Sequence, residues 1–461
     1  KEKYLLEVNG RYDGTSRFMK DQRWNFFPSF SLGWNVAREN FWKPLESVVN
    51  QFKLRGSWGE LGNQNTSNLY PFYEILPVKS NSGNWLVNGG KTNTADIPSL
   101  VSTLLTWERV RSFNVGFDFG AFSNRLTGSF DYFVRKTVDM VGPAPQLPLV
   151  LGIAPAIVNN ADMKSYGFEI ELSWRDRIGE VDYGVKFNLA DAQQKVVKYP
   201  NTTNAFSDWY AGKMSGEIWG YTSLGIAKTD EEMKEHLASL PNGGQNQLGN
   251  KWGAGDIMYA DINGDGKVDG GKGTLADPGD QRIIGNSTPR YNFGLVLDTS
   301  YKGFDVSIFF QGVGKRDYAP IVGTNGAVFW GAVNNIWQSM AMEEHFDYFR
   351  PEGHPMGANL NGYYPRPDFT SNKNHQVQTR YLQDASYIRL KNLQIGYTLP
   401  KQWINKLHIN RCRVYVSGDN LWTGTSLASM FDPETLAAGD WGSGKTYPLS
   451  KVISFGLNVN F

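Results

Sequence analysis

One stretch of the chain has the residue types and spacing of a calcium-binding loop. Oxygen-bearing side chains alternate along it, Gly266 allows a sharp turn, and such an oxygen-rich shell is what Ca²⁺ prefers. The predicted metal ligands are the side chains of Asp261, Asn263, Asp265 and Asp269, the last directly or through water, and the backbone carbonyl of Lys267.

The end of this loop departs from the pattern. Lys272 stands where a calcium loop has a bidentate glutamate, so Asp277 or Asp280 would have to complete the shell. The alternative is a surface turn rich in Gly and Asp that holds no metal. If calcium binds, we expect it to stiffen a long loop and to play no part in catalysis.

A second stretch, Gly439–Thr446, matches the phosphate-binding pattern of a P-loop. That pattern works because backbone amides at the start of a helix surround phosphate groups. Here Tyr447 and Pro448 follow at once, and then a strand pattern, so no helix is available. We interpret the match as chance loop sequence.

Nothing else in the sequence suggests an enzyme. The five histidines show no paired-ligand spacing, and the single cysteine, Cys412, excludes an intrachain disulfide and a zinc site built from several thiolates. No set of nucleophile, base and orienting group can be proposed from spacing. The formal net charge of +1 argues against a protein built to bind nucleic acid.

The segments between the expected strands are rich in Trp and Tyr. Such rings could stack on sugar faces, but more often they pack the cores of loops or lie at a membrane interface. The rings in question are Trp85, Trp107, Trp209, Tyr210, Trp219, Trp252, Trp330, Trp337, Tyr363, Tyr364 and Trp441.

The elements that carry these loops are predicted to be strands, because apolar residues recur at every second position. One face of each segment is apolar and the other is mostly Gly, Ser, Asn and charged residues. We predict about twelve strands of about nine to eleven residues, the length that crosses a bilayer at a tilt. They centre on 4–12, 28–36, 52–58, 113–119, 126–134, 166–174, 183–189, 291–297, 304–310, 393–399, 412–416 and 453–461. A phase slip upstream of Leu393 predicts a β-bulge near Lys391 or Asn392.

The connections alternate between short turns and long loops. The long loops are 62–111, 136–164, 191–290, 312–385 and 419–450, and several loops of that length are rare in a compact soluble domain. Outer-membrane barrels have short periplasmic turns and long extracellular loops. One longer periplasmic link, 37–51, has helix-like character around 44–49. The last segment is an amphipathic strand that ends on Phe461, which resembles an outer-membrane assembly signal.

Several stretches, in this order, resemble the SusC/RagA family of TonB-dependent transporters. They are Asn9–Phe18, Phe27–Trp34, Glu39–Phe41, Phe52–Gly59, Gly62–Asn63, Asp261–Gly266, Tyr381–Leu393, Gly396–Tyr397 and Gly418–Leu421. The resemblance implies a 22-stranded transmembrane antiparallel β-barrel filled by an N-terminal plug with a TonB box. The chain starts within a strand pattern, without Met or a signal peptide, so we expect it to be the C-terminal portion of such a barrel, without the plug.

The resemblance also implies a function. Family members import oligosaccharides or peptides, energised by the TonB complex, with a SusD-like lipoprotein as a lid. We therefore expect a multi-pass protein of the Gram-negative outer membrane, embedded in its lipid. Two alternatives remain: a passive porin, which lacks a plug, and a soluble carbohydrate-binding β-sandwich, whose sheets alternate in the same way.

Overall fold

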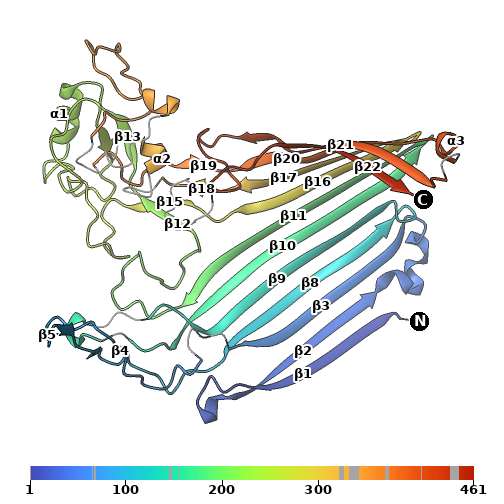
Figure 1. Ribbon diagram of the computed structural model, residues 1–461, viewed down its shortest axis with the longest axis horizontal. Coiled ribbons are helices and arrows are strands. Elements are labelled where there is room, and N and C mark those ends of the chain that lie inside the picture. Colours follow the sequence, from blue (N-terminus) through green and yellow to red (C-terminus); the bar gives the residue numbers. More distant parts are fainter. Residues whose placement is uncertain are drawn as a thin grey trace. The chain divides into compact units, whose positions relative to one another are not determined.

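Twelve long strands follow one another in an antiparallel sheet whose strand order is the order of the sequence (Figure 1). The computed structural model describes residues 2–64, 66, 69–144, 148–153, 155–320, 327–331, 342–368, 373–405, 408–436 and 446–461. The strands are β1 (Tyr4–Gly14), β2 (Trp24–Asn35), β3 (Val49–Asn63), β8 (Glu108–Ala121), β9 (Leu126–Val141), β10 (Asn159–Ile178), β11 (Val181–Lys198), β16 (Arg290–Tyr301), β17 (Phe304–Lys315), β20 (Tyr387–Thr398), β21 (Arg411–Thr425) and β22 (Val452–Asn460).

The prediction of twelve strands is confirmed, and so is the predicted β-bulge. Phe309 pairs with Asn392 and Phe310 with Leu390, so Lys391 has no partner on β17. One extra residue reverses the side on which each following side chain lies. The phase slip seen in the sequence therefore has this bulge as its cause.

Several strands are longer than predicted. β9 has 16 residues, β10 has 20 and β11 has 18. The apolar alternation stops near residue 189 in β11, but the strand continues to Lys198. Backbone hydrogen bonding between neighbouring strands does not depend on apolar side chains, so the ladders run on beyond the part of each strand that apolar periodicity detects.

The two faces of the sheet differ in chemistry. On one face, the apolar face, rings stack between neighbouring strands: Phe30 on Trp58 with centroids 5.9 Å apart, and Phe117 on Phe130 at 5.6 Å. On the opposite face, the polar face, Arg55 of β3 reaches acids of β8 and β9. This division is the one that the sequence alternation predicts.

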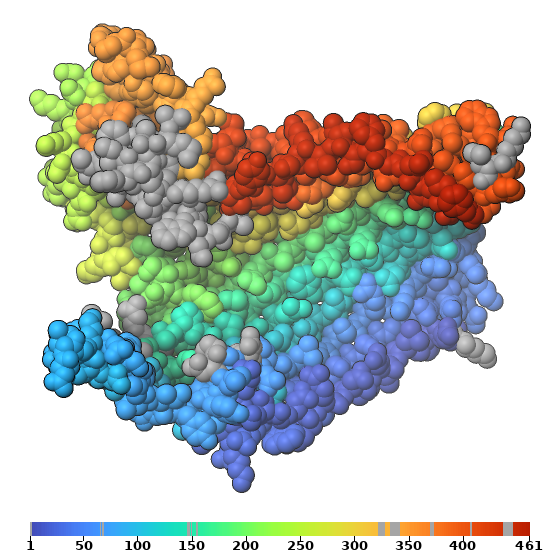
Figure 2. Space-filling model, in the orientation of Figure 1, coloured from blue at the N-terminus to red at the C-terminus, as the bar shows by residue number. Residues whose placement is uncertain are grey.

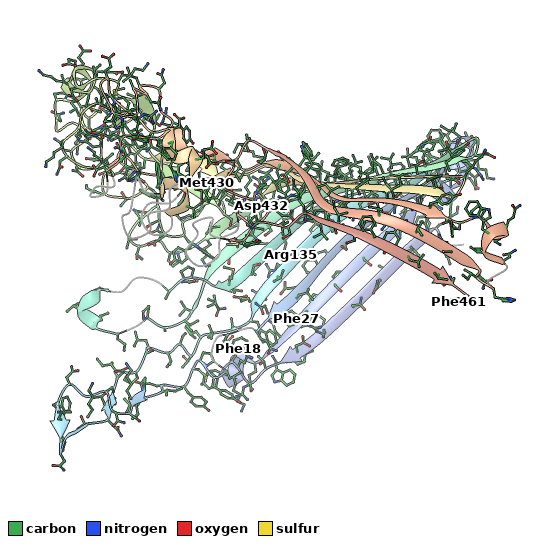
Figure 3. All side chains as sticks on the ribbon, turned by 45° about the horizontal axis from the view of Figure 1, so that its top comes forward. Phe18, Phe27, Arg135, Met430, Asp432 and Phe461 are labelled. Carbon is green, nitrogen blue, oxygen red and sulfur yellow. The ribbon has the colours of Figure 1, made fainter. Side chains whose placement is uncertain are left out.

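The chain divides into two compact units, which are described separately below. The first comprises residues 1–169 and 192–214, and the second comprises 170–191 and 215–461. In the first unit Phe18 and Phe27 lie together (Figure 3) and pack with Leu105 and Trp107. In the second unit the loops form a body of their own, in which segments near residues 230 and 360 lie together (Figure 2).

Short elements build the loops. The strands are β4 (Val78–Lys79), β5 (Leu86–Val87), β6 (Gly90–Lys91), β7 (Thr94–Ala95), β12 (Glu217–Gly220), β13 (Ser223–Ile226), β14 (Ile257–Tyr259), β15 (Arg282–Asn286), β18 (Asp317–Tyr318) and β19 (Gln383–Asp384). The helices are α1 (Asp230–Ala238), α2 (Ala327–Trp330) and α3 (Lys401–Ile404). In the described part of the chain, no helix has both the length and the apolar character that a membrane crossing requires.

The link between β2 and β3 is helical earlier than predicted. It contains 3-10 turns at Val36–Arg38 and Asn40–Leu45, whereas the sequence suggested helix around 44–49. β3 already begins at Val49, because its pairing with β8 extends to the turn. Between the two 3-10 turns, Glu39 accepts hydrogen bonds from Lys3 and Tyr4, which ties the link to the first strand.

Candidate functional site

On the polar face of the first unit, one arginine links three neighbouring strands, β3, β8 and β9. Arg55 donates from Nε to Asp118 Oδ2 at 3.0 Å and from Nη2 to Asp131 Oδ2 at 2.6 Å. Gly116 lies directly between Arg55 and Asp131 in the register. A Cβ atom at position 116 would meet Asp131 Oδ1 at 2.6 Å, so only glycine leaves room for this bridge.

A second arginine links three strands of the other unit through its hydrogen bonds. Arg413 of β21 donates from Nε to Asp305 of β17 at 2.9 Å and from Nη2 to Gln394 at 2.9 Å. It crosses β20 at Gly396, where a Cβ atom would lie 2.6 Å from its Cζ. The bridge therefore spans three strands, again over a glycine.

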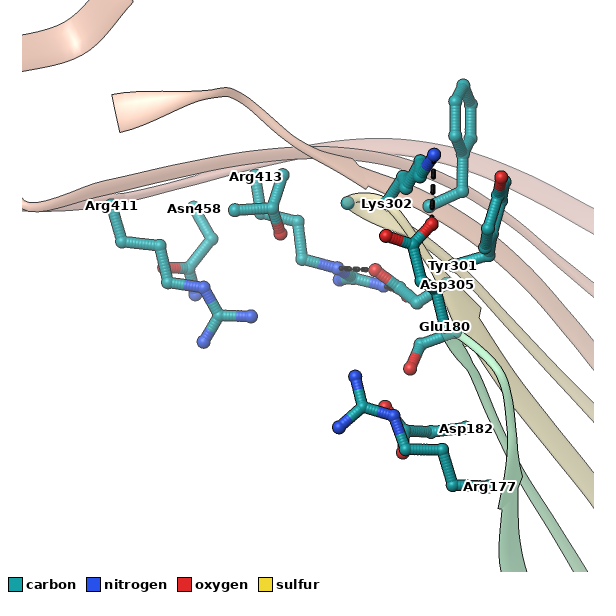
Figure 4. Close-up of a pocket in the computed structure, with 13 residues that line it drawn as sticks. Arg177, Glu180, Asp182, Tyr301, Lys302, Asp305, Arg411, Arg413 and Asn458 are labelled. Carbon is teal, nitrogen blue, oxygen red and sulfur yellow. Dashed lines mark hydrogen bonds and ion pairs between the residues drawn. The ribbon is translucent and has the colours of Figure 1, made fainter. Parts of the chain in front are cut away.

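This second bridge lines a hollow of about 670 Å³ (Figure 4). The hollow lies beside the short turns that join β10 to β11 and β16 to β17. Its wall carries four cationic and three acidic side chains: Arg177, Lys302, Arg411, Arg413, Glu180, Asp182 and Asp305. At the turns, Lys302 donates to Glu180 at 2.9 Å, and this hydrogen bond raises the pKa of Lys302.

The side chains of the polar face are suited to contact with water. Charged and amide groups are hydrogen-bonded to one another across strands, and the hollow is broad and open. Such a surface can hold water and exchange hydrogen bonds with a polar solute. These bridges are not evident from the sequence alone, although a charged residue and a glycine on the same face of neighbouring strands are a usable signal for them.

The loop body of the second unit is centred on a buried carboxylate. Asp256 is fully buried and accepts from Arg366 Nη2 at 2.6 Å, from Lys373 Nζ at 2.9 Å and from Asn374 Nδ2 at 2.9 Å. Lys373 is also buried, with an exposed fraction of 1%. Two cations around one acid supply the pairing that a buried charge requires, and they tie segments that are more than a hundred residues apart.

Aromatic rings fill the rest of this body. Trp330 and Tyr364 are buried in one cluster with Phe329, Tyr381 and Phe431. His375 lies 4.5 Å from the Trp330 ring, and burial lowers its pKa to about 4. After β21 the loop through Met430 and Asp432 (Figure 3) contributes Phe431, and Asp432 accepts from Arg389 at 2.7 Å.

The rings singled out in the sequence therefore serve mainly as packing residues. Trp330 and Tyr364 lie in the loop core and Trp107 in the core of the first unit, whereas Trp85 is exposed. The others in the described part, Trp209, Tyr210, Trp219, Trp252 and Tyr363, are partly buried. Trp337 and Trp441 lie outside the described residues, and so does most of the P-loop match at 439–446.

The predicted calcium loop is folded by its own hydrogen bonds. Asp261 accepts from the amides of Gly264 and Gly266, at 2.6 and 2.8 Å. Asp265 accepts from the amide of Lys267 at 3.2 Å, and the Lys267 ammonium reaches Asp269 at 2.5 Å. Asn263 and Asp265 are also joined to each other.

Asp280 takes part in this loop through backbone amides. It is fully buried and accepts from the amides of Ile262 and Asp269, at 2.7 and 2.8 Å. The Lys272 amide donates to the Asp277 carbonyl. Across the described residues, no group of three or more His, Cys, Asp or Glu side chains is arranged to hold a metal ion. Calcium binding by Asp261, Asn263, Asp265, Lys267 and Asp269 stays a prediction.

Comparison with known proteins places this architecture in a family. Residues 1–421 match the family model described as TonB dependent receptor-like, beta-barrel. The chain therefore belongs to this family of outer-membrane β-barrels, as the sequence resemblance implied.

Individual relatives agree with that assignment. The chain is 29% identical to the TonB-dependent receptor P3 of Formosa agariphila and 24% identical to the TonB-dependent receptor SusC of Bacteroides thetaiotaomicron, in both cases over its whole length. It covers 44% and 42% of those proteins. Among solved structures, the RagAB peptide transporter matches the whole chain with a TM-score of 0.74 at 22% identity, and the chain covers 46% of it. The chain thus spans less than half the length of these relatives, and the likeness to the solved structure concerns the fold.

Proposed function

We propose that the chain forms part of the wall of an active importer in the outer membrane of a Gram-negative bacterium. The observation that carries the proposal is the division of the sheet into two faces. Rings stack on the apolar face, which suits contact with lipid, while the arginine bridges of Arg55 and Arg413 lie on the polar face, which suits a water-filled interior. Membership of the receptor family supports the same assignment.

Transport energised by TonB is the second part of the proposal. The chain has 24–29% identity over its whole length to proteins named TonB-dependent receptors. In this mechanism, the long loops and a SusD-like surface lipoprotein capture the cargo, and the TonB complex supplies the energy for import. The charged hollow beside the short turns would be on the cargo's route to the periplasm.

The cargo is proposed to be an oligosaccharide or a peptide. The likeness to SusC and to a structure named as a peptide transporter supports this pair of classes. The polar face is suited to either, because its side chains offer both donors and acceptors of hydrogen bonds. Both classes are too large to pass a general porin easily, and so an energised route is needed.

Uptake by cells that express the full-length protein tests the proposal. Fluorescently labelled peptides and oligosaccharides of similar mass are supplied to cells with an intact TonB complex and to cells that lack it. Accumulation of one cargo class only when TonB is present is the expected result. Equal uptake in both strains would favour a passive porin, and a protein extracted without detergent would favour a soluble sandwich.

A further inference from the structure

Two cations interrupt the apolar face near one end of the sheet. Glu60 of β3 lies directly opposite Arg111 of β8, and Arg111 lies directly opposite Lys136 of β9. The next row along the same strands is Trp58, Phe113 and Val134. Since residues two apart on a strand share a face, Arg111 and Lys136 project on the same side as these apolar residues.

The position of this row along the strands is also defined. β3 ends at Asn63, β8 begins at Glu108 and β9 ends at Val141, so the row lies close to the end that leads into the long connections. In an outer-membrane barrel that end is extracellular. The row therefore follows the apolar rows at the level where hydrocarbon gives way to lipid headgroups.

Glu60 holds one of the cations in a fixed orientation. The Arg111 Nε donates to Glu60 Oε2 at 2.7 Å, and the Glu60 side chain is only 10% exposed. The two terminal nitrogens of Arg111 have no hydrogen-bond partner among the described residues, and its side chain is 41% exposed. An arginine fixed through Nε presents its two remaining nitrogens as a fork that fits phosphate oxygens.

Lys136 adds a second charge that no described acidic side chain pairs with. Its side chain has no hydrogen bond or ion pair with any residue that the structure describes. The neighbouring Arg109 pairs with Asp139 at 2.7 Å and lies 3.7 Å from Glu60. Of these five side chains, three are cationic and two are acidic, and both acids are paired with arginines.

We propose that Arg111 and Lys136 bind the phosphate group of a phosphorylated lipid in the outer leaflet. Basic side chains at the border of a transmembrane surface bind anionic headgroups. The apolar row of Trp58, Phe113 and Val134 would lie against the acyl chains of the same lipid. This site lies on the lipid side of the wall and does not depend on the proposed import function.

Native mass spectrometry of the full-length protein tests the site, with diphosphoryl lipid A as the probe. The variant Arg111→Gln/Lys136→Gln is expected to bind at least about tenfold more weakly, the loss that follows from removing charge-assisted hydrogen bonds. Dephosphorylated lipid A is expected to bind the wild type no better than it binds this variant. Inorganic phosphate at millimolar concentration is expected to compete only weakly, because it lacks acyl chains.

Arg135→Gln provides a matched control. Arg135 (Figure 3) precedes Lys136 on β9 and projects from the opposite face, so the same charge is removed from the side away from lipid. If Arg135→Gln weakened lipid binding as much as Lys136→Gln, or if both phosphorylated and dephosphorylated lipid bound equally, the proposal would be wrong. Lys136→Gln alone guards against a folding defect, since it removes a side chain without partners in the described chain, and heat-shifted gel mobility reports the folded barrel.

Discussion

Arg413 reaches Asp305 by crossing the strand between them at Gly396. In the register Asp305 pairs with Gly396, and Thr398 pairs with Arg413, so the guanidinium runs diagonally over β20. The glycine is what keeps this path open, because any side chain there would occupy the position of the guanidinium. Arg55 also reaches Asp131 over a glycine, but there Arg55, Gly116 and Asp131 lie directly opposite one another in the register.

Gly396→Ala should therefore break the hydrogen bonds of Arg413 to Asp305 and Gln394. The Arg413 side chain is flexible and can move aside, but only by leaving Asp305 and Gln394. We expect a loss of about 1–2 kcal/mol in unfolding free energy, since the bridge is partly exposed. Urea-dependent loss of heat-shifted gel mobility of the full-length protein measures it.

Gly184→Ala is the control for this prediction. Gly184 lies on β11, and a Cβ atom there would meet nothing closer than Arg175 Cγ at 3.5 Å, an ordinary contact. If both alanine variants shifted the urea midpoint equally, the cost would come from the strand backbone, and the role assigned to Gly396 would be refuted.

Asp256→Asn should loosen the loop body of the second unit. The substitution leaves the buried Lys373 ammonium without a carboxylate, and breaking a buried pair in this way costs about 3–5 kcal/mol. We expect faster tryptic cleavage within 342–385 while the barrel keeps its heat-shifted mobility. Asp21→Asn, at an exposed position in a short turn, should leave cleavage unchanged. Unaltered cleavage in Asp256→Asn would show that the network does not hold the loops.

The loop body should lose stability as the pH falls below about 6.5. Burial lowers the pKa of His375 to about 4 in the folded protein, so the unfolded loop binds a proton at a higher pH than the folded one. Stability is therefore full above the unfolded pKa and decreases as the pH falls from about 6.5 to about 4, by up to ~3 kcal/mol. Hydrogen exchange of 342–385 at pH 7 and pH 5 measures this change.

His375→Phe separates this effect from general acid sensitivity. The phenylalanine ring keeps the contact with Trp330 but cannot bind a proton. The hydrogen-exchange protection of the variant's loop body should therefore change less between pH 7 and pH 5 than that of the wild type. If the variant lost protection at pH 5 to the same extent as the wild type, another group would have to be responsible.

Calcium, if it binds the 261–269 loop, should protect the amides of that loop from exchange. Binding has to compete with the Lys267 ammonium at Asp269, so we expect Lys267→Met to tighten it. Isothermal titration of the full-length protein with calcium, before and after Asp261→Asn/Asp265→Asn, measures the affinity. If neither protein released or absorbed heat on titration with calcium, the loop would be a turn that holds no metal and is stabilised by its own backbone amides.

The sequence predicts the sheet well, because each strand has one apolar and one polar face. That periodicity is local, and even the bulge at Lys391 leaves a visible change of phase. Strand ends such as 191–198 are missed, since backbone pairing continues there without apolar alternation. The 3-10 turns at Asn40–Leu45 are missed for a similar reason, because their bounds depend on where β3 begins to pair.

The candidate site is harder to predict, because its groups meet across strands. Asp305, Gly396 and Arg413 are unremarkable one at a time, and only the register brings them into one diagonal. The role of the aromatic residues also depends on long-range contacts. Trp330 is buried and Trp85 is exposed, a difference that the residue type alone does not predict.

The contacts of Asp256 have a consequence for assembly. Its partners Arg366, Lys373 and Asn374 come after β16 and β17, so the hairpin formed by these strands must be in place, with both of its flanking loops on one side of the membrane, before the contacts can form. If only one of the two strands crossed the membrane, the carboxylate and its cations would lie on opposite sides. Formation of the Asp256 network therefore requires that both strands of the hairpin have crossed.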